Sequence, residues 1–295
     1  MTPQEQMKQD QEKIETALNL QFTNDVPQKT LYEAMRYSLL AGGKRIRPVL
    51  VMESCRICGG DPENALPFAC ALEMVHTYSL IHDDLPCMDN DDYRRGKLTS
   101  HKVYGEAMAT LAGDGLLTAA FGVLSGSWAR ECQSPEQIAA AVSCLASAAG
   151  EDGMVAGQVL DLQWEARKDL TREELEQVHD RKTGALLRCA CELGRISAGG
   201  SQEQSEALKK YASNLGLAFQ IRDDILDVTS TAQELGKPVG SDAENGKTTF
   251  VTLLGLEESQ KLVESLSARA KEALAGFEKR DFLCWLADSL ASRRK

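Results

Sequence analysis

The chain has 295 residues, and its 44 acidic against 33 basic side chains give it a formal net charge of −11. This excess of negative charge repels nucleic acid and anionic membrane surfaces, so we expect neither as a partner. No stretch approaches the roughly 20 uninterrupted apolar residues of a membrane span, and the charged N-terminus lacks the apolar core of a secretory leader. These features predict a cytoplasmic protein whose anionic ligands would be bound by local cations or by metal.

Apolar residues recur at helical spacing almost throughout the chain, which predicts an all-α fold. The pattern is clear at 31–40, 186–193 and 215–225. None of the breaks between these segments is long and low in complexity, so the sequence predicts one domain, residues 1–295, built as a bundle of ten or more helices. The breaks carry Gly, Pro, Asn or Asp and fall at 41–48, 58–64, 84–92, 94–101, 197–202 and 234–247.

The nine cysteines are an odd number and stand mostly within apolar helical segments, so we expect reduced thiols in the core. Cys55 and Cys58 form a single CxxC pair without a second pair or histidines at zinc spacing. A metal or redox role for this pair is the less favoured interpretation.

Two apolar helical segments, ALEMVHTYSLIHDD and LGLAFQIRDDILD, each lead into a cluster of aspartates. Like charges one helical turn apart destabilise a helix, and carboxylates at a helix C-terminus oppose its dipole. Mg²⁺ takes oxygen ligands and is commonly held by one or two carboxylates together with substrate phosphates. The clusters therefore predict a magnesium and phosphate site, with solvated helix ends as the alternative. Their members are Asp83 and Asp84 in the first segment, and Asp223, Asp224 and Asp227 in the second.

A bound polyphosphate would also require cations near these helix ends. Arginine is suited to bidentate phosphate contacts and lysine to point-charge contacts. Each basic residue taken singly is most simply a solvated charge, but four glycine-flanked groups together predict phosphate binding. They are Lys44, Arg45 and Arg47 in GGKRIRP, Arg94 and Arg95 after the first cluster, Lys182 in RKTGAL, and Lys237 with Lys247 after the second cluster. A P-loop, a dinucleotide-binding GxGxxG and a GxSxG nucleophile elbow are absent from the sequence.

The motifs GGKRIRP, HDDLPCMDNDDYRRG, GQ at 157–158, KTGAL, FQIRDDILD and LGKPVGSD resemble, in this order, those of the trans-type short-chain prenyl (polyprenyl) diphosphate synthases. The similarity extends from about residue 30 to 255. It implies an all-α isoprenoid synthase fold in which the two aspartate-rich helix ends face each other across a deep central cavity. It also implies a homodimer.

The same resemblance implies a reaction and assigns residues to it. Three Mg²⁺ ions, with Mn²⁺ as an alternative, would bind the diphosphate of an allylic substrate through Asp83, Asp84, Asp89, Asp223, Asp224 and Asp227. Arg94, Lys182, Lys237 and Lys247 would contact that diphosphate, and Lys44, Arg47, His76 and Arg95 would bind isopentenyl diphosphate. Ionisation of the allylic substrate would leave a carbocation, which the double bond of isopentenyl diphosphate attacks. Thr183 and Gln220 would steady the cation, with helix packing as the alternative role for both.

Tyr78 bears on the length of the product. It stands five residues before Asp83, about 7.5 Å back along a helix and about 140° around it. An aromatic residue there, with two extra residues inside the first motif, is typical of bacterial farnesyl diphosphate synthases. The resemblance, rather than helical geometry, therefore predicts farnesyl diphosphate made from dimethylallyl and geranyl primers. Geranylgeranyl diphosphate is the alternative, because plant-type geranylgeranyl synthases share the insertion.

Two alternatives come from other classes of protein. His82 beside Asp83 suggests a metal-dependent phosphohydrolase of the HD kind, but only His76, His101 and His179 remain to supply further ligands. A non-catalytic regulatory subunit would be expected to lose an aspartate motif or a cation, and none is lost. The C-terminal SRRK is most simply a solvated end, although in related enzymes a basic tail closes over isopentenyl diphosphate.

Overall fold

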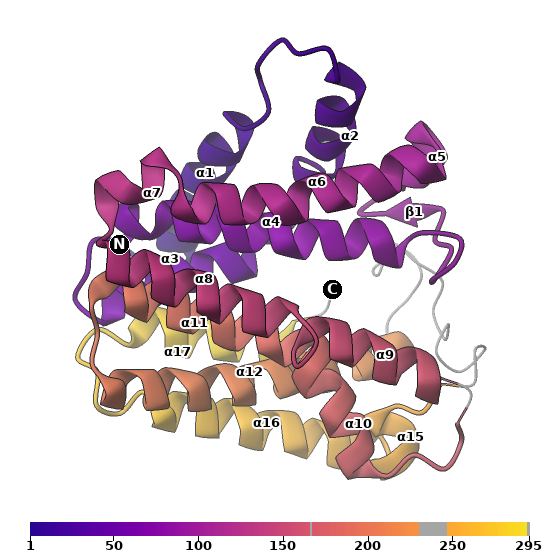
Figure 1. Cartoon of the computed structure of the whole chain (residues 1–295). Coiled ribbons are helices and arrows are strands. Elements are labelled where there is room, and N and C mark those ends of the chain that lie inside the picture. The colour runs from indigo at the N-terminus through magenta and orange to yellow at the C-terminus, as the bar shows by residue number, and fades with distance from the viewer. Residues whose placement is uncertain (166, 230–246, 294–295) are drawn as a thin grey trace.

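The structure is a computed structural model that describes residues 1–165, 167–229 and 247–293. This part of the chain is almost entirely helical, which confirms the predicted all-α fold (Figure 1). The first half contains α1 (Pro3–Asn19), α2 (Lys29–Leu39), α3 (Ile46–Ile57), η1 (Pro62–Ala65), α4 (Leu66–Asp83), β1 (Tyr93–Arg94), β2 (Lys97–Leu98), α5 (Ser100–Tyr104), α6 (Glu106–Ser125), α7 (Ser127–Cys132) and α8 (Pro135–Ala149). The second half contains α9 (Met154–Trp164), α10 (Arg172–His179), η2 (Asp180–Gly184), α11 (Ala185–Ala198), α12 (Gln202–Thr229), α15 (Phe250–Leu254), α16 (Leu256–Ala273) and α17 (Asp281–Ser292).

The helices pack as a layered bundle. Helix α4 packs against α6, α3 and α11, and α11 packs in turn against α3, α8 and α12. Helix α12 packs against α16 and α17, which lie at the far side of the bundle from α2 and α6 (Figure 1). The two helices that end in aspartate clusters, α4 and α12, therefore lie in different layers, and α11 contacts both.

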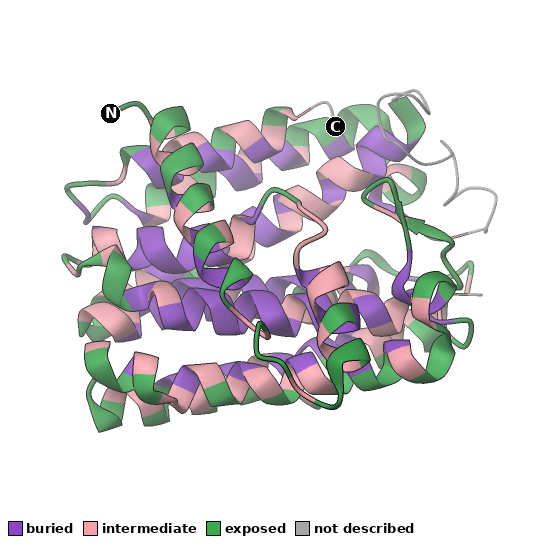
Figure 2. Cartoon of the chain, turned by 90° about the horizontal axis from the view of Figure 1, so that it is seen from above, coloured by how far each residue is buried: buried purple, intermediate pink, exposed green. Residues whose placement is uncertain are grey.

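Helix α4 is the central element because its sequence is apolar all round. Nearly all of its residues before the last turn are buried, among them Phe68, Leu72 and Met74, each with 0% exposure. A helix without a polar face is stable in water only when neighbours cover every side. Figure 2 shows buried residues concentrated on the inner helices and exposed residues on the outward sides of the others. The buried part of α4 thus fixes the position of its polar C-terminal end, Asp83 and Asp84, at the edge of the core.

Local capping sets the boundaries of several helices. Helix α8 begins with a capping box between Ser134 and Gln137, with Pro135 at its first position. Helix α10 begins with a capping box between Thr171 and Glu174. These reciprocal bonds satisfy backbone donors that have no partner inside the helix. Helix α11 ends at Gly199, whose φ of +65° is the left-handed conformation that glycine adopts most easily.

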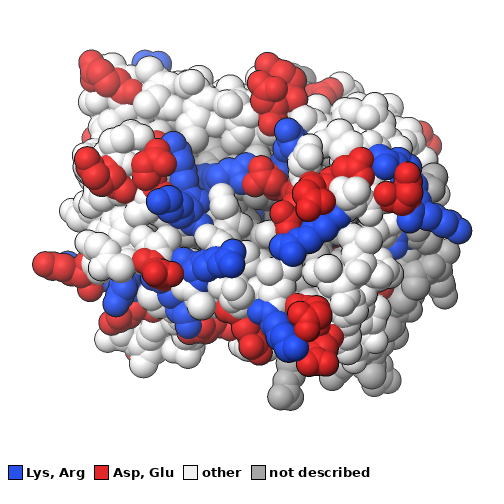
Figure 3. Space-filling model, turned by 90° about the horizontal axis from the view of Figure 1, so that it is seen from below, with Lys and Arg blue, Asp and Glu red and all other residues white. Residues whose placement is uncertain are grey.

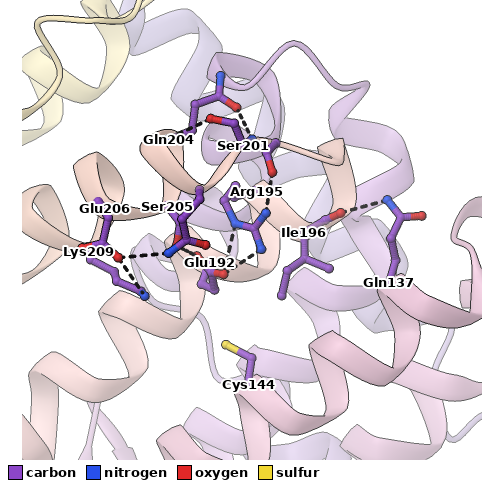
Figure 4. Close-up of polar contacts among 12 residues, drawn as sticks. Gln137, Cys144, Glu192, Arg195, Ile196, Ser201, Gln204, Ser205, Glu206 and Lys209 are labelled. Carbon is purple, nitrogen blue, oxygen red and sulfur yellow. Dashed lines mark hydrogen bonds and ion pairs between the residues drawn. The ribbon is translucent and has the colours of Figure 1, made fainter.

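A polar cluster joins α8, α11 and α12 at the end of the bundle where α12 begins (Figure 4). Arg195 donates to Glu192 at 3.0 Å, and Ser205 donates to the same carboxylate at 2.7 Å. Gln137 of α8 donates to the carbonyl of Ile196 at 2.8 Å. Because carbonyls at the end of α11 and a carboxylate in its last turns are satisfied by side chains of its neighbours, this end of the three helices is fixed in position.

A two-stranded hairpin follows the first aspartate cluster, where the sequence predicts only a connector. Strands β1 and β2 pair through Tyr93 with Leu98 and through Arg94 with Lys97. The turn residues Arg95 and Gly96 both have positive φ, at +53° and +75°, as a type I′ turn requires. Alternation over two residues is too short a pattern to predict, although the turn chemistry of Arg95 and Gly96 permits it.

Within the part of the chain that the structure describes, two helical stretches are long and apolar enough, by length and composition alone, to cross a membrane. They are Glu106–Cys132, with a mean hydropathy of 1.5, and Pro135–Trp164, with a mean hydropathy of 1.2. Only 33% and 28% of their most apolar windows are buried within the chain. Neither stretch is an uninterrupted apolar run, because the first contains Asp114 and the second includes the break between α8 and α9. Core helices of soluble proteins pass the same test, but these two stretches leave apolar surface uncovered.

Candidate active site

The site begins where α4 ends. Asp84 is 3% exposed, and Arg94 of β1 donates to its Oδ1 at 2.6 Å. Burial raises the pKa of Asp84, and hydrogen bonding and charge from Arg94 act against this rise. The hairpin therefore places Arg94 on a carboxylate of the first cluster. Asp84 and Arg94, both predicted site residues, form one unit in the structure.

Asp83 lies in a different environment from Asp84. It accepts a hydrogen bond from the side chain of Gln158, and its Oδ2 lies 4.0 Å from Nζ of Lys182. The backbone carbonyl of Asp83 accepts from the backbone N–H of Asp89 at 2.9 Å, which folds the exposed Asp89 back toward the end of α4. Three predicted residues, Asp83, Asp89 and Lys182, are thus brought together.

Helix α9 and Glu165, the residue directly after it, hold these groups, and two of the three side chains that do so were not predicted from the sequence. Gln158 donates to Asp83, Asp161 accepts from Lys182 at 2.6 Å, and Glu165 pairs with Lys247 at 3.0 Å. Positions 158, 161 and 165 follow one another at helical spacing on a single face. This polar stripe in the otherwise apolar segment MVAGQVLDLQWE was the available signal. Only Gln158 was noticed, as part of the GQ motif.

The segment that carries Lys182 is the π-helical turn η2. It packs against α9, α10, α11 and α12. It therefore contacts both α9, which holds Asp83, and α12, which carries the second aspartate cluster. Gly157 of α9 makes this packing possible, because a Cβ there would collide with the backbone nitrogen of Lys182. Thr183, the next residue, is 9% exposed. Single π-helical turns inside longer helices occur frequently at functional positions.

The second cluster lies on the last turns of α12. Asp224 is 8% exposed and accepts the backbone N–H of Phe250, the first residue of α15, at 2.7 Å. Asp227 is 3% exposed. Asp223 is the most accessible of the three, with 45% of its side chain exposed, and it forms an ion pair with Arg293. Asp223 is therefore the carboxylate of this cluster that faces outward.

Arg293 is a site residue that the sequence analysis did not select. Its side chain is 12% exposed and stacks on Phe219, with Cζ 3.9 Å from the ring centroid. Its own carbonyl accepts from Nε of Arg222 at 2.9 Å. The interpretation of SRRK as a solvated end is therefore wrong for Arg293, while residues 294–295 lie outside the described part of the chain. The signal was the basic tail itself, but no local pattern shows where a tail folds back.

Three predicted binding residues form a group, here called the cation group, in which two arginines, Arg47 and Arg95, lie close to His76. Nη1 of Arg47 lies 3.4 Å from Nε2 of His76, and Nη1 of Arg95 donates to the carbonyl of Gly42. Burial lowers the pKa of Arg47 to about 10, with the charge of Glu73 acting against this shift and the charge of Arg95 adding to it. Burial, together with Arg47 and Arg95, also lowers the pKa of His76 well below 6.5. Nε of Arg47 is a buried donor without a partner among the described residues. The arrangement is suited to an anion, which would offset the repulsion between Arg47 and Arg95 and accept a hydrogen bond from Nε of Arg47.

For four other predicted residues the structure gives less information about a role in the site. Lys44 is exposed beside this cation group in sequence, and its carbonyl accepts from Gln11 at 2.7 Å. Gln220 is partly buried on α12, one turn before Asp223. Tyr78 of α4 is 7% exposed, with its ring edge-to-face against His82. Lys237 lies outside the described residues.

The donor set is suited to magnesium together with a ligand, rather than to a metal held by protein alone. Within residues 1–165, 167–229 and 247–293, no three His, Cys, Asp or Glu side chains converge as a preformed metal site. Mg²⁺ commonly keeps several waters and is bound by one or two carboxylates plus substrate phosphates. Asp83 and Asp223, each on a helix end and each partly exposed, supply oxygens of this kind.

The histidines do not form the site of an HD phosphohydrolase. Nε2 of His82 lies 3.1 Å from the carbonyl of Thr110 on α6, so this ring faces the packing between α4 and α6. His101 contacts the hydroxyl of Thr99, and His179 stacks on Phe250. The described histidines therefore have separate surroundings, and this alternative receives no support from the geometry.

The CxxC pair also shows no metal-site geometry. Cys55 is buried, with its Sγ 3.3 Å from the carbonyl of Asp61. Burial raises the pKa of Cys55 to about 11 and that of Cys58 to about 12. Both thiols are therefore protonated at neutral pH, whereas the thiolate is the form that binds metal or attacks a disulfide.

The outer face formed by α16 and its neighbours does not offer a competing phosphate site. A groove of about 530 Å³ between α10, α12 and α16 is bordered by Arg172, Arg181 and Arg269, but also by Glu173 and Glu176. Figure 3 shows this side of the molecule with acidic and basic side chains intermixed around a hollow. Mixed signs leave no net positive field for a polyphosphate.

The all-α bundle, its two aspartate-bearing helix ends and the cation group between α3 and α4 together define a prenyl diphosphate synthase. The chain belongs to the polyprenyl synthetase family, whose model matches residues 28–279. It is thus a trans-prenyltransferase by family, as the motifs indicated.

Curated relatives are similar over most of the chain. A geranylgeranyl pyrophosphate synthase from the chloroplast of Capsicum annuum is 50% identical over 265 residues, which cover 89% of this chain and 71% of the relative. The large subunit of a heterodimeric geranylgeranyl pyrophosphate synthase from Arabidopsis thaliana is 51% identical, covering 84% and 67%. A dimethylallyltranstransferase from Fischerella ambigua is 46% identical, covering 97% and 82%.

Solved structures are similar over nearly the whole chain. An apo FPP/GFPP synthase from Zymomonas mobilis has a TM-score of 0.87 at 36% identity, covering 98% of this chain and 99% of the other. A geranylgeranyl pyrophosphate synthetase from Pyrococcus horikoshii has a TM-score of 0.89 at 33% identity, with the same coverage. The isoprenoid synthase fold implied by the motifs is therefore confirmed.

Proposed function

We propose that this protein condenses isopentenyl diphosphate with dimethylallyl and geranyl diphosphates to make farnesyl diphosphate. The observation that carries the proposal is the pairing of two unlike groups at one end of α4. Asp83 lies 4.0 Å from Lys182, a carboxylate and a cation placed for a metal-bound diphosphate. Arg47, Arg95 and His76 form a second anion site with a buried donor that has no partner among the described residues.

The allylic diphosphate would bind between the two aspartate clusters. Mg²⁺ or Mn²⁺ would supply Lewis-acid stabilisation of the leaving diphosphate, and three ions match the number that the resemblance implies. We assign direct metal ligation to Asp83, Asp89 and Asp223. Asp84, Asp224 and Asp227 are the three buried carboxylates of the set, and Arg94 and the N–H of Phe250 already hold two of them. The buried carboxylates would orient the others and add negative charge.

The chain's own cations would stabilise the charge that develops as diphosphate leaves. Lys182 would donate to the leaving oxygens, with Arg94 and Lys247 contributing charge. Cations fixed in place before the reaction act more strongly than mobile water, because they need no reorganisation. Thr183 and Gln220 would turn their oxygens toward the allylic carbocation. With a second anion held by the cation group, the site would serve a two-substrate condensation.

Isopentenyl diphosphate would occupy the group formed by Arg47, His76 and Arg95, with Lys44 at its edge. The low pKa of His76 keeps its imidazole neutral at pH 7, so it would act as a hydrogen-bond donor rather than as a cation. Fixing the diphosphate would direct the double bond at the carbocation. Attack would leave a new carbocation, and the carbon beside it would lose a proton to the departing diphosphate as the product double bond forms.

Product length rests on Tyr78, which is 7% exposed on α4 one and a half turns before Asp83. A large ring at this depth would stop a growing chain at fifteen carbons. Geranylgeranyl diphosphate is the second candidate, because curated relatives that are 50% identical or more carry the name geranylgeranyl pyrophosphate synthase.

Incubation with Mg²⁺, isopentenyl diphosphate and each allylic primer, followed by mass spectrometry of the products, tests the proposal. We expect farnesyl diphosphate and an inactive Asp83→Asn variant. Asp114→Asn, an exposed carboxylate on α6, is the matched control and should retain activity. A twenty-carbon product would favour the second candidate. Absence of any product would favour a regulatory subunit and overturn the proposed activity.

We further propose that the chain assembles with a second copy of itself. Helices α6 and α9 expose large apolar side chains, including Leu111 at 53%, Val159 at 46% and Leu162 at 50%. Large apolar side chains that are exposed on the surface are typical of an interface. Sedimentation velocity should give a mass of twice 32.2 kDa, and a monomer at micromolar concentration would contradict this proposal.

A further inference from the structure

Lys182 lies between two carboxylates and is bonded to only one of them. Its Nζ is 2.6 Å from Oδ2 of Asp161 and 4.0 Å from Oδ2 of Asp83. Burial acts to raise the pKa of Asp161, but the charge and hydrogen bond of Lys182 lower it below the ordinary value. Asp161 is therefore ionised at neutral pH and holds the ammonium on the α9 side.

The backbone around Lys182 leaves little freedom for any other arrangement. Gly157 brings α9 against the backbone of η2 so closely that no Cβ fits between them. Helix α9 also fixes Asp83 through Gln158. Because both carboxylates are held, the flexible side chain of Lys182 alone decides which of the two it neutralises. A movement of about 1.2 Å, from 4.0 Å to a charge-assisted bond of about 2.8 Å, would place it on Asp83.

We propose that Asp161 is a positioning residue that keeps the ammonium of Lys182 away from Asp83, and so leaves Asp83 open to the metal ion. This inference rests on the proposed function, which assigns Asp83 to metal and Lys182 to diphosphate. A lysine bonded to Asp83 would compete with the metal for the same oxygens before any substrate arrives. Asp161 removes that competition and still leaves the lysine within reach of the leaving group.

The test separates metal binding from catalysis. Binding of Mn²⁺ alone is measured by electron paramagnetic resonance on the full chain, without pyrophosphate or prenyl substrates, so that the contact of Lys182 with diphosphate does not enter the affinity. In Asp161→Asn, Lys182 loses its partner and moves to Asp83, so Mn²⁺ affinity should fall about tenfold, the effect of one charge-assisted bond. The double variant Asp161→Asn with Lys182→Met should recover the affinity, because the competing ammonium is gone. Its turnover should remain low, since Lys182 is also needed for diphosphate departure.

Matched controls guard against trivial explanations. Asp180→Asn removes a carboxylate from the same turn, one that pairs with Arg188 rather than Lys182, and should leave Mn²⁺ affinity unchanged. Asp161→Glu keeps the charge and should bind Mn²⁺ like the parent protein. Thermal unfolding of each variant shows whether it is folded.

Three results would overturn the inference. Equal loss of affinity in the single and double variants would make Asp161 itself a metal ligand. Unchanged affinity in Asp161→Asn would leave it no role toward Asp83, and a loss explained by unfolding would make it structural. Failure of the proposed function is distinguishable, because it would appear as absent prenyl products while the pattern of Mn²⁺ affinities among these variants stayed as expected.

Discussion

Arg293, the residue after the last turn of α17, forms an ion pair with Asp223 on α12 and stacks on the ring of Phe219. The end of the described chain thus places a cation on the accessible carboxylate of the second aspartate cluster. Nε of Arg293 is buried without a partner among the described residues. A cation in this position would compete with the metal ion that we propose for Asp223.

Removal of this cation should change metal binding and stability in opposite directions. In Arg293→Ala we expect Mg²⁺ to stabilise the protein at lower concentration, because one competitor for Asp223 is gone. Without metal, the melting temperature should fall by a few degrees, as about 1 kcal/mol of lost stacking and pairing implies. Scanning calorimetry across a Mg²⁺ titration measures both effects.

Lys271→Ala is the control for Arg293→Ala, because Lys271 forms a comparable ion pair with Asp288 of α17 on the outer surface. It should leave the Mg²⁺ dependence unchanged. If Arg293→Ala and Lys271→Ala responded alike to Mg²⁺, the cation on Asp223 would have no special effect.

Two glycine substitutions should separate close helix packing from helix propensity. In Gly157→Ala the new Cβ would collide with the backbone of η2, so we expect a loss of about 1–3 kcal/mol and a sharp fall in kcat. Gly122→Ala, on α6, meets open space and should be neutral or stabilising by up to about 1 kcal/mol. Urea unfolding gives both values, and equal stabilities would refute the close contact.

Replacement of Tyr78 should lengthen the product. Tyr78→Ala removes a ring on α4 that is 7% exposed, and the space would admit at least one further five-carbon unit. Products from geranyl diphosphate should shift from fifteen toward twenty carbons or more by mass spectrometry. Tyr32→Ala removes a ring on α2 that packs on Phe22, and should leave the distribution as it was. An unchanged distribution in Tyr78→Ala would remove this residue from chain-length control.

His179 should make the folded state sensitive to acid. Burial lowers its pKa to about 4 from 6.5, so between these values the unfolded chain binds a proton that the folded protein does not. The contribution of His179 to stability is therefore present above pH 6.5 and is lost progressively as the pH falls toward 4. Urea unfolding at pH 7, 5.5 and 4.5 should show a flatter dependence in His179→Leu than in the parent. An equally steep fall in both proteins would contradict this assignment.

The helical class, the two aspartate segments and the grouping of Lys182 with Asp83 could be predicted from sequence, because each depends on a local pattern or an ordered set of motifs. The role of Asp161 could not, since it is one charge in an apolar helix until η2 packs beside it. Arg293 was missed for the same reason. Its partner lies 70 residues away, and only the path of α17 along α12 brings the two together. The different surroundings of Asp83 and the more buried Asp84 also depend on the hairpin, because Arg94 of β1 bonds Asp84. The four strand residues of the hairpin are too few for an alternating pattern to predict it.

Helix α9 has three faces with different tasks. Gly157 faces the backbone of η2, Gln158 and Asp161 hold charged groups, and Val155 and Val159 are exposed to solvent. A second subunit that covered the exposed face would contact the same helix that positions Lys182 and Asp83. Helix α9 would then serve both the subunit interface and the active site. Dissociation into single chains on dilution would lower the turnover rate, although no reacting group would change.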